Sequence, residues 1–124
     1  MVTTKAVGDG AEEAAARWLQ ARGLEIVQRN YRVARGPHAR GGEIDLIARD
    51  AEGTLVFVEV RHRADTRHGG AAATVSRTKQ QRIVHAARHY LAGLARLPPC
   101  RFDVVAMDGD QVTWLRGAFD AGGR

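Results

Sequence analysis

Two acidic residues, Asp45 and Glu59, are the first candidates for chemistry, because each lies inside a short apolar segment typical of a β-strand. The segments 41–49 and 54–61 predict a β-hairpin. If its turn is a three-residue loop with Gly53 in the left-handed conformation, Asp45 faces Glu59 across the hairpin. Facing residues lie about 4.5 to 5.5 Å apart at Cα, so two carboxylates there repel unless a cation lies between them or one holds a proton. The spacing therefore predicts a divalent-metal site.

The metal prediction depends on the length of that turn. A two-residue loop would shift the pairing by one residue and place the two carboxylates on opposite faces of the hairpin. The longer loop also places Glu43 opposite Arg61, which makes Arg61 the expected cross-strand partner of Glu43. The period of two places Ile44 on the same face as Leu46.

Length and composition bound the fold and the kind of partner. A chain of 124 residues with 44% hydrophobic residues fits one domain, residues 1–124, with frayed ends expected at 1–7 and 120–124. Nineteen lysines and arginines against fourteen acidic residues give a net charge of +5, which suits a polyanionic partner. Cys100 is the only cysteine, so an internal disulfide and a cysteine-based zinc site are excluded. We expect a cytoplasmic protein without a membrane segment.

The remaining pattern supplies the elements that would position the two carboxylates. Asp9 as N-cap and Glu12 three residues later predict a helix that ends at Gly23. Ser76 predicts the cap of a second long helix, which we expect the prolines at 98–99 to end. Strands are predicted at residues 24–32, 41–49, 54–61, 101–107 and 111–116, the first of them at a sheet edge. This order predicts an α/β fold in which helices flank a mixed sheet.

Basic residues surround the predicted acidic face. The loop at 33–42, the loop that follows residue 61 and the first turns of the second helix are all rich in basic or amide side chains. A helix N-terminus also favours anions, so these three segments are candidates to contact a phosphate backbone. The residues that we expect to bind nucleic acid are Arg32, Arg35, Arg40, Arg63, Lys79, Gln80 and Arg82.

Several separate motifs resemble one known family. They are Gly42-Glu43-Ile44-Asp45-Leu46-Ile47, Phe57-Val58-Glu59-Val60-Arg61, Asn30-Tyr31-Arg32 and Arg101-Phe102-Asp103-Val104-Val105. Together, in this order, they resemble the YraN family, which is grouped with Holliday-junction-resolvase-like and restriction-endonuclease-like proteins. The arrangement of Glu12, Asp45 and Glu59 is similar to that of the wider PD-(D/E)xK superfamily, whose core is αβββαβ. The resemblance runs from about Gly8 to Phe119.

The resemblance implies cleavage of phosphodiester bonds with a divalent metal. Asp45 and Glu59 would then ligate Mg²⁺ or Mn²⁺, the backbone carbonyl of Val60 would add an oxygen, and Glu12 would assist through water or a second metal. Oxygen ligands suit these hard cations. The implied catalytic residues are Glu12, Asp45, Glu59 and Arg61.

Arg61 departs from the superfamily motif, which has lysine at this position. Arginine stays protonated, so Arg61 is suited to hold a phosphate and unsuited to accept a proton from water. Lys79, at the start of the second helix, is a candidate source of an amine near the site.

Two main hypotheses about the function follow, and a third is more distant. The first is a metal-dependent nuclease acting on DNA, with branched or damaged DNA as candidate substrates. The second is a catalytically inactive nucleic-acid-binding module of the same fold. The third is a protein-interaction domain whose basic charge is incidental. A homodimer is compatible with each.

Structural roles remain open for the same residues. Glu12 is equally well explained as the last member of a capping box with Asp9. Asp45 and Glu59 could belong to an ion-pair cluster with arginines, and Gln80 could be a solvated helix residue. His85 and His89 have the spacing of a chelating pair, yet no carboxylate or cysteine completes the set in the sequence nearby.

Overall fold

The computed structural model describes residues 4–37, 41–62 and 75–122, and for residues 4–9 the backbone alone. Along the chain it contains one helix, three strands, a second helix and two further strands. These are α1 (Thr4–Gln20), β1 (Glu25–Val33), β2 (Gly42–Arg49), β3 (Leu55–His62), α2 (Arg77–Ala92), β4 (Cys100–Asp108) and β5 (Gln111–Phe119). The order confirms the predicted α/β class with an αβββαβ core of the restriction-endonuclease-like type, followed by one extra strand.

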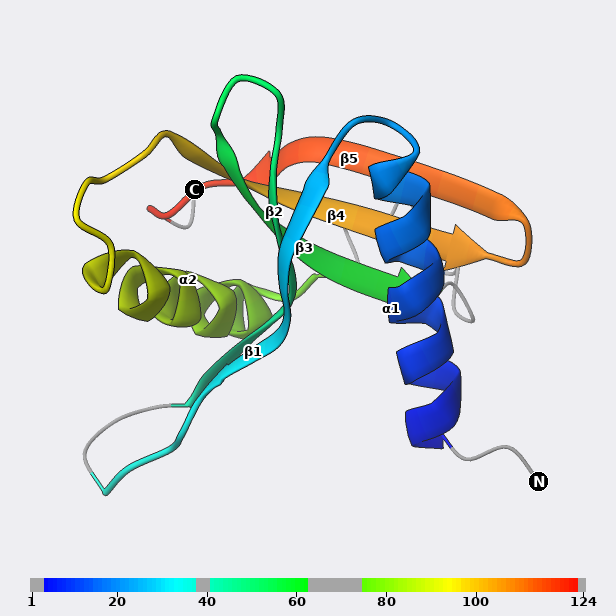
Figure 1. Cartoon of the computed structure of the whole chain (residues 1–124). Coiled ribbons are helices and arrows are strands. Elements are labelled where there is room, and N and C mark those ends of the chain that lie inside the picture. The colour runs from blue at the N-terminus through cyan, green and yellow to red at the C-terminus, as the bar shows by residue number, and fades with distance from the viewer. Residues whose placement is uncertain (1–3, 38–40, 63–74, 123–124) are drawn as a thin grey trace.

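The five strands form one mixed sheet in the order β1-β2-β3-β4-β5. Only β3 and β4 are parallel, and the connection between them contains α2 (Figure 1). The other neighbours are antiparallel. β1 lies at one edge of the sheet, as predicted.

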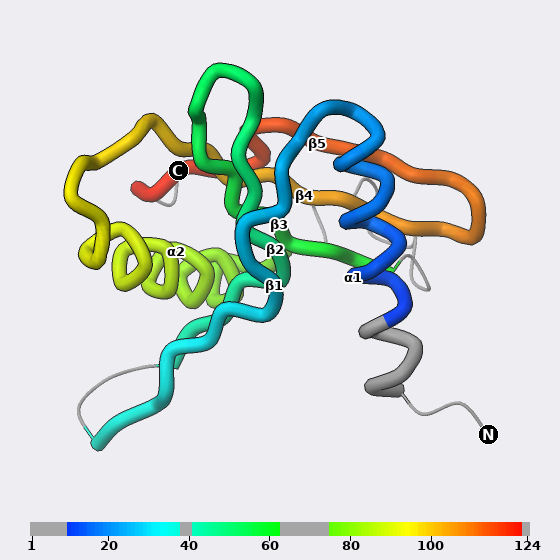
Figure 2. Tube along the Cα trace, in the orientation of Figure 1, coloured from blue at the N-terminus to red at the C-terminus, as the bar shows by residue number. Residues whose placement is uncertain are grey.

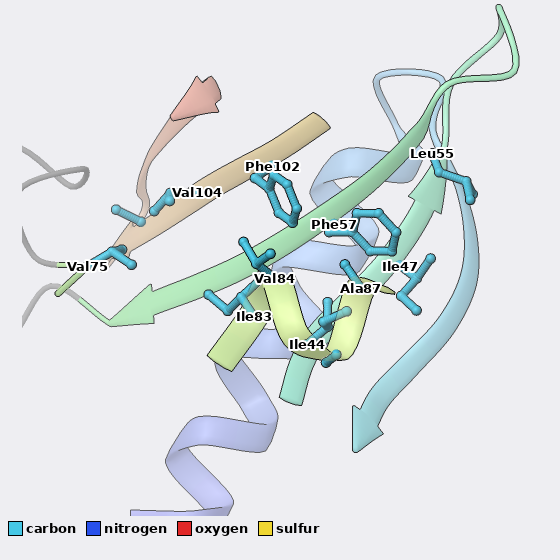
Figure 3. Packing of buried hydrophobic residues seen from close by; sticks show 12 residues of the cluster. Ile44, Ile47, Leu55, Phe57, Val75, Ile83, Val84, Ala87, Phe102 and Val104 are labelled. Carbon is cyan, nitrogen blue, oxygen red and sulfur yellow. The ribbon is translucent and has the colours of Figure 1, made fainter. Parts of the chain in front are cut away.

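The two helices cover opposite faces of the sheet, and each face has its own hydrophobic cluster. Ala15, Ala16 and Leu19 of α1 pack with Val56 and Val58. On the other face, residues of α2 pack against aromatic and aliphatic side chains of the sheet, as Figure 3 shows for Ile83, Val84, Ala87, Phe57, Phe102 and Ile44. Because β3 alternates between the two clusters, Phe57 and then Glu59 face the α2 side.

The turn between β2 and β3 has the predicted geometry. The pairing Arg49↔Leu55 continues to Leu46↔Val58, which is the register of a three-residue loop. Gly53 has φ +90°, a conformation that glycine adopts without strain. The Oδ1 of Asp50 also accepts hydrogen bonds from the turn amides of Glu52 and Thr54, which fixes the loop.

β2 and β3 separate beyond Leu46↔Val58, and β2 continues with β1 as a projecting arm (Figure 2). At this fork the predicted faces of β2 are wrong: Leu46 packs in the α1 cluster, whereas Ile44 packs in the α2 cluster. The cause is a local bend. Asn30, which the register places opposite Asp45, has φ +53°, and the change of cluster between Ile44 and Leu46 occurs at this point, although β1 and β2 keep their register.

The helix boundaries differ from the prediction in two places. α1 begins at Thr4, so Asp9 lies inside the helix and does not cap it. Residues 4–8 contain no proline, and aspartate inside a helix costs only about 0.7 kcal/mol relative to alanine. α2 does begin after Ser76, whose side chain accepts the amide hydrogen of Lys79, but Gly93 forms its C-cap well before the two prolines.

Gly42 allows α2 to lie directly on the start of β2. A Cβ at this position would be 2.5 Å from the carbonyl oxygen of Arg82 and 3.1 Å from the backbone nitrogen of Ala86. Such a distance is shorter than any normal contact, so only glycine fits. This close approach brings the first turn of α2, with Lys79, over the acidic residues of the fork.

None of the helices in the described parts of the chain is long and apolar enough to cross a membrane.

Candidate metal centre and its basic surround

The two predicted carboxylates meet at the fork between β2 and β3. The register places Asp45 opposite Glu59, one step beyond the last paired residues. Oδ2 of Asp45 accepts a hydrogen bond from the backbone nitrogen of Val60 at 2.8 Å, which holds Asp45 against β3. The side chain of Glu59 is only 3% exposed. The two carboxyl groups are close enough for Asp45 to shift the pKa of Glu59.

The environment of Glu59 favours its protonated form. Burial, followed by the negative charge and the hydrogen bond of Asp45, raises the pKa of Glu59 to about 8. Lys79 and Arg61 oppose this shift without cancelling it. Among the described residues, Oε1 of Glu59 is buried and has no hydrogen-bond partner. A buried oxygen without a partner, next to a second carboxylate, is the environment that a cation would satisfy.

Two cations lie on the other oxygen of Glu59. Nη1 of Arg61 is 3.5 Å from Oε2 of Glu59, and Nζ of Lys79 is 3.9 Å from the same oxygen. Lys79 reaches this position from α2, whereas Arg61 follows Glu59 on β3. The amine at this site therefore comes from α2, whereas the superfamily motif has its lysine at the position of Arg61 on β3.

Glu43 lies at the rim of the site. The prediction that it pairs with Arg61 is wrong. Because β2 and β3 have separated by this point, Glu43 pairs with Lys79 at 3.0 Å in place of Arg61. Arg32, its neighbour on β1, lies at 3.9 Å, and Arg82 lies at 4.0 Å. The hydrogen bond from Lys79, against the effect of burial and with help from both arginines, lowers the pKa of Glu43 below its ordinary value.

Glu12 lies in the interior of α1, half-buried and in line with the residues that pack on the sheet. Since α1 begins at Thr4, Glu12 is eight residues from the helix start, and the capping-box explanation for it is wrong. Its role beside Asp45 and Glu59 stays a prediction.

The predicted nucleic-acid-binding residues divide into two groups. Arg32, Lys79 and Arg82 surround the carboxylates, as described above. Arg35 is exposed at the end of the β1–β2 arm, away from this cluster, and the side chain of Gln80 donates to the carbonyl of Val75. Arg40 and Arg63 lie outside the described residues.

The residues present fit a hard divalent cation in part. Among the described residues, no group of three or more histidine, cysteine, aspartate or glutamate side chains is arranged to hold a metal. Mg²⁺ and Mn²⁺ do not require one, because Mg²⁺ is commonly bound by one or two carboxylates together with waters and substrate phosphate. The Asp45–Glu59 pair could supply two such ligands, and the backbone carbonyl of Val60 is the predicted third.

A second buried carboxylate, Asp103, has the opposite environment. Its side chain is fully buried and accepts hydrogen bonds from Nε of Arg101, from Nε1 of Trp114 and from the backbone nitrogen of Gly117. Arg101 in turn binds Asp50 in the β2–β3 turn at 3.1 Å. Both carboxylate oxygens of Asp103 accept hydrogen bonds. Asp103 therefore connects β4 with β5 and has a structural role. The sequence showed only its neighbour Arg101, because the donors on β5 are distant in the chain.

Comparison with known proteins places the chain in a family. A model described as "Uncharacterised protein family UPF0102" matches residues 11–107. A UPF0102 protein of Methylibium petroleiphilum is 69% identical over 121 residues, which cover 98% of this chain and 99% of that protein. A UPF0102 protein of Albidiferax ferrireducens is 58% identical over 119 residues, covering 96% of this chain and 91% of that one.

The similarity extends to a more distant relative. A UPF0102 protein of Cupriavidus taiwanensis is 56% identical over 117 residues, covering 94% of this chain and 85% of the relative. These matches agree with the motif resemblance that the sequence displays, and the chain belongs to the UPF0102 (YraN) family.

Proposed function

We propose that this protein is a divalent-metal-dependent hydrolase of phosphodiester bonds in DNA. The observation that carries the proposal is the Asp45–Glu59 pair at the strand fork. Keeping a glutamate 3% exposed beside a second carboxylate, with its pKa raised to about 8, costs stability in the metal-free protein. A metal ligand role explains why such a costly arrangement is present.

When bound, a divalent cation at this site would lower the pKa of a coordinated water and neutralise charge on the phosphate. Asp45 and Glu59 would hold the ion, and the amide of Val60 already orients Asp45 for this. Glu59 must lose its proton to serve as a ligand, so the neighbouring Lys79 and Arg61, which favour its charged form, support this role.

The cations around the pair have separate uses. Arg61, whose side chain is 36% exposed, can donate two hydrogen bonds to the scissile phosphate. Lys79 is 23% exposed and lies between Glu43 and Glu59, so it can stabilise negative charge that develops close to both. Arg32 and Arg82 are more exposed and form the outer part of the basic surround, where they would contact flanking phosphates.

The direct test is cleavage of labelled DNA by purified protein. We expect Mg²⁺ or Mn²⁺ to support cleavage of at least one substrate among duplex, single-stranded, flap and four-way DNA, and chelation to abolish it. Asp45→Asn keeps the size of the side chain and removes its charge, so it should remove the activity.

Glu52→Gln provides the matched control, because Glu52 is an exposed acid in the turn of the same hairpin. It should cleave as the unmodified protein does. If none of the four substrates is cut with either metal, or if Asp45→Asn cuts as well as the unmodified protein, the catalytic proposal fails.

A second candidate is a DNA-binding module that does not cleave. Two observations favour it: Arg61 cannot act as a base, and the amine of Lys79 is held at 3.0 Å by Glu43. This candidate predicts binding to DNA that weakens steeply with added salt and is unchanged by EDTA. Binding that requires Mn²⁺ and is lost in Asp45→Asn would exclude it.

A further inference from the structure

A groove runs along the side of α2 that faces away from the candidate metal centre. At about 100° per residue, Arg88 lies about 180° around the helix from Lys79. The groove is formed by α2, the segment that follows it, β4 and the tail at residues 120–122. It consists of two adjoining cavities of about 210 and 440 Å³, which share Val84, Arg88 and Ala121 as lining residues.

The larger cavity is almost entirely apolar. Leu91, Leu97 and Phe102 contribute to its walls together with Val84 and Ala87. Leu97 is 77% exposed, although a large aliphatic side chain is normally withdrawn from water. The volume is large enough for one bulky apolar side chain of a partner. This half of the groove therefore offers an anchor site of the kind that protein interfaces use.

The smaller cavity has a mixed lining that includes three basic side chains. Arg77, His85 and Arg88 line it, with Asp120 as its single acidic residue. Among the described residues, no carboxylate lies within ion-pair distance of Arg77 or Arg88. Along the helix axis the two arginines are about 16 Å apart, which an extended peptide spans with about five residues. Two available guanidinium groups at this spacing favour an extended ligand that carries carboxylates.

We propose that this groove binds a short acidic peptide segment of a partner protein. An apolar side chain of the peptide occupies the cavity beside Leu97, and carboxylates next to it bind Arg88 and then Arg77. The apolar half makes nucleic acid the poorer match, because a phosphate backbone has no side chain that would fill it.

The proposal concerns a surface separate from the metal centre and does not depend on the proposed hydrolase activity. It is tested by selecting random short peptides, displayed on phage, against the immobilised full chain. We expect the selected peptides to share an apolar residue followed by aspartate or glutamate. A representative synthetic peptide is then titrated against the protein and its variants by fluorescence anisotropy.

Arg88→Glu and Leu97→Ser change exposed side chains, so both variants should fold. Each should weaken binding of the peptide at least tenfold, while Arg17→Glu, an exposed arginine of α1 on the opposite side of the sheet, should leave it unchanged. The proposal is overturned if no peptides are enriched, if they lack acidic residues, or if Arg88→Glu binds them equally well. Displacement of the peptide by a short DNA duplex would also overturn it and would assign the groove to nucleic acid.

Discussion

Glu59 and Asp103 are both buried carboxylates, and the donors around them determine what each contributes. Asp103 receives hydrogen bonds from an arginine, an indole and a backbone amide. Glu59 faces another carboxyl group, and its Oε1 has no hydrogen-bond partner among the described residues. Neutralising the two residues should therefore change stability in opposite directions.

Without metal, Glu59→Gln should be more stable than the unmodified protein, and this difference should increase as the pH rises. In the unfolded chain this glutamate loses its proton near pH 4.5, whereas in the folded protein its pKa is about 8. Between these values the folded state holds the extra proton, so stability falls with rising pH, and the loss is complete above pH 8. Glutamine has no such loss. The difference in free energy of unfolding should grow by roughly 2 to 5 kcal/mol between pH 4 and pH 9.

Urea unfolding in the presence of EDTA at a series of pH values measures this difference. Asp45→Asn serves as the companion variant, because removing the neighbouring charge should reduce the pH dependence without abolishing it; burial, the larger cause, remains. Parallel stability curves for the unmodified protein and Glu59→Gln would show that Glu59 titrates normally.

Asp103→Asn should destabilise the protein by about 2 to 4 kcal/mol. Trp114 donates to Oδ2 of Asp103 and Gly117 to Oδ1, so the amide nitrogen of asparagine leaves one of these two donors without an acceptor, and Arg101 loses the negative charge of its buried partner. Thermal unfolding measures the effect. Asp110→Asn, in the exposed turn between β4 and β5, is the control and should unfold at the same temperature as the unmodified protein. Equal melting temperatures for the two variants would contradict the structural role of Asp103.

At the scale of elements, the docking of α2 on β2 determines whether Lys79 reaches the carboxylates. Gly42→Ala places a methyl group 2.5 Å from the carbonyl oxygen of Arg82, so the helix must move or the strand must bend. We expect the free energy of unfolding to fall by about 1 to 3 kcal/mol, as is typical of overpacked cores, and the melting temperature to fall with it. Differential scanning calorimetry would measure it.

Gly10→Ala is the matched substitution. Gly10 lies in α1 with nothing within 4 Å of an added Cβ and no positive φ, so alanine should stabilise the helix by about 0.5 to 1 kcal/mol. Two identical changes should therefore have effects of opposite sign. If Gly42→Ala were as harmless as Gly10→Ala, the close contact between α2 and β2 would not exist.

Most helices and strands could be predicted from the sequence, because alternating apolar residues, turn residues and helix caps lie within or next to the element that they specify. The sequence left two lengths open for the turn after β2, and the structure has the longer one, with Gly53 in the left-handed conformation and the register that brings Asp45 opposite Glu59. The cap at Ser76 was predicted correctly. The start of α1 was harder to predict. Asp9 is a suitable N-cap, but the residues before it are equally compatible with a helix, and the helix begins at Thr4.

The parts of the site that escaped prediction depend on contacts between distant segments. The pairing of Glu43 with Lys79 requires the close approach at Gly42, and the change of face at Ile44 requires the bend opposite Asn30. Neither contact leaves a periodic trace in the sequence. The hairpin pattern identified Asp45 and Glu59, and Lys79 was already a candidate source of an amine, but its distance of 3.9 Å from Glu59 depends on how α2 docks on the sheet.

At the scale of the whole molecule, α2 separates two surfaces with different chemistry. One side of the helix faces a strand fork with two carboxylates and a ring of basic residues, and the other side lines an apolar groove with a basic end. The net charge of +5 suits a polyanion at the first surface. If both proposals hold, the protein would act on DNA at the first surface while a partner is bound at the second.

Titration of Mn²⁺ by isothermal calorimetry at pH 8 would show whether Asp45 and Glu59 form a divalent-metal site. Wild-type protein should show saturable binding of a single Mn²⁺ per chain, Glu52→Gln should bind it equally, and Asp45→Asn and Glu59→Gln should lose the binding while still folded by circular dichroism. Absence of Mn²⁺ binding by the wild-type protein at millimolar metal, or unchanged binding by Asp45→Asn, would show that the two carboxylates do not form a metal site.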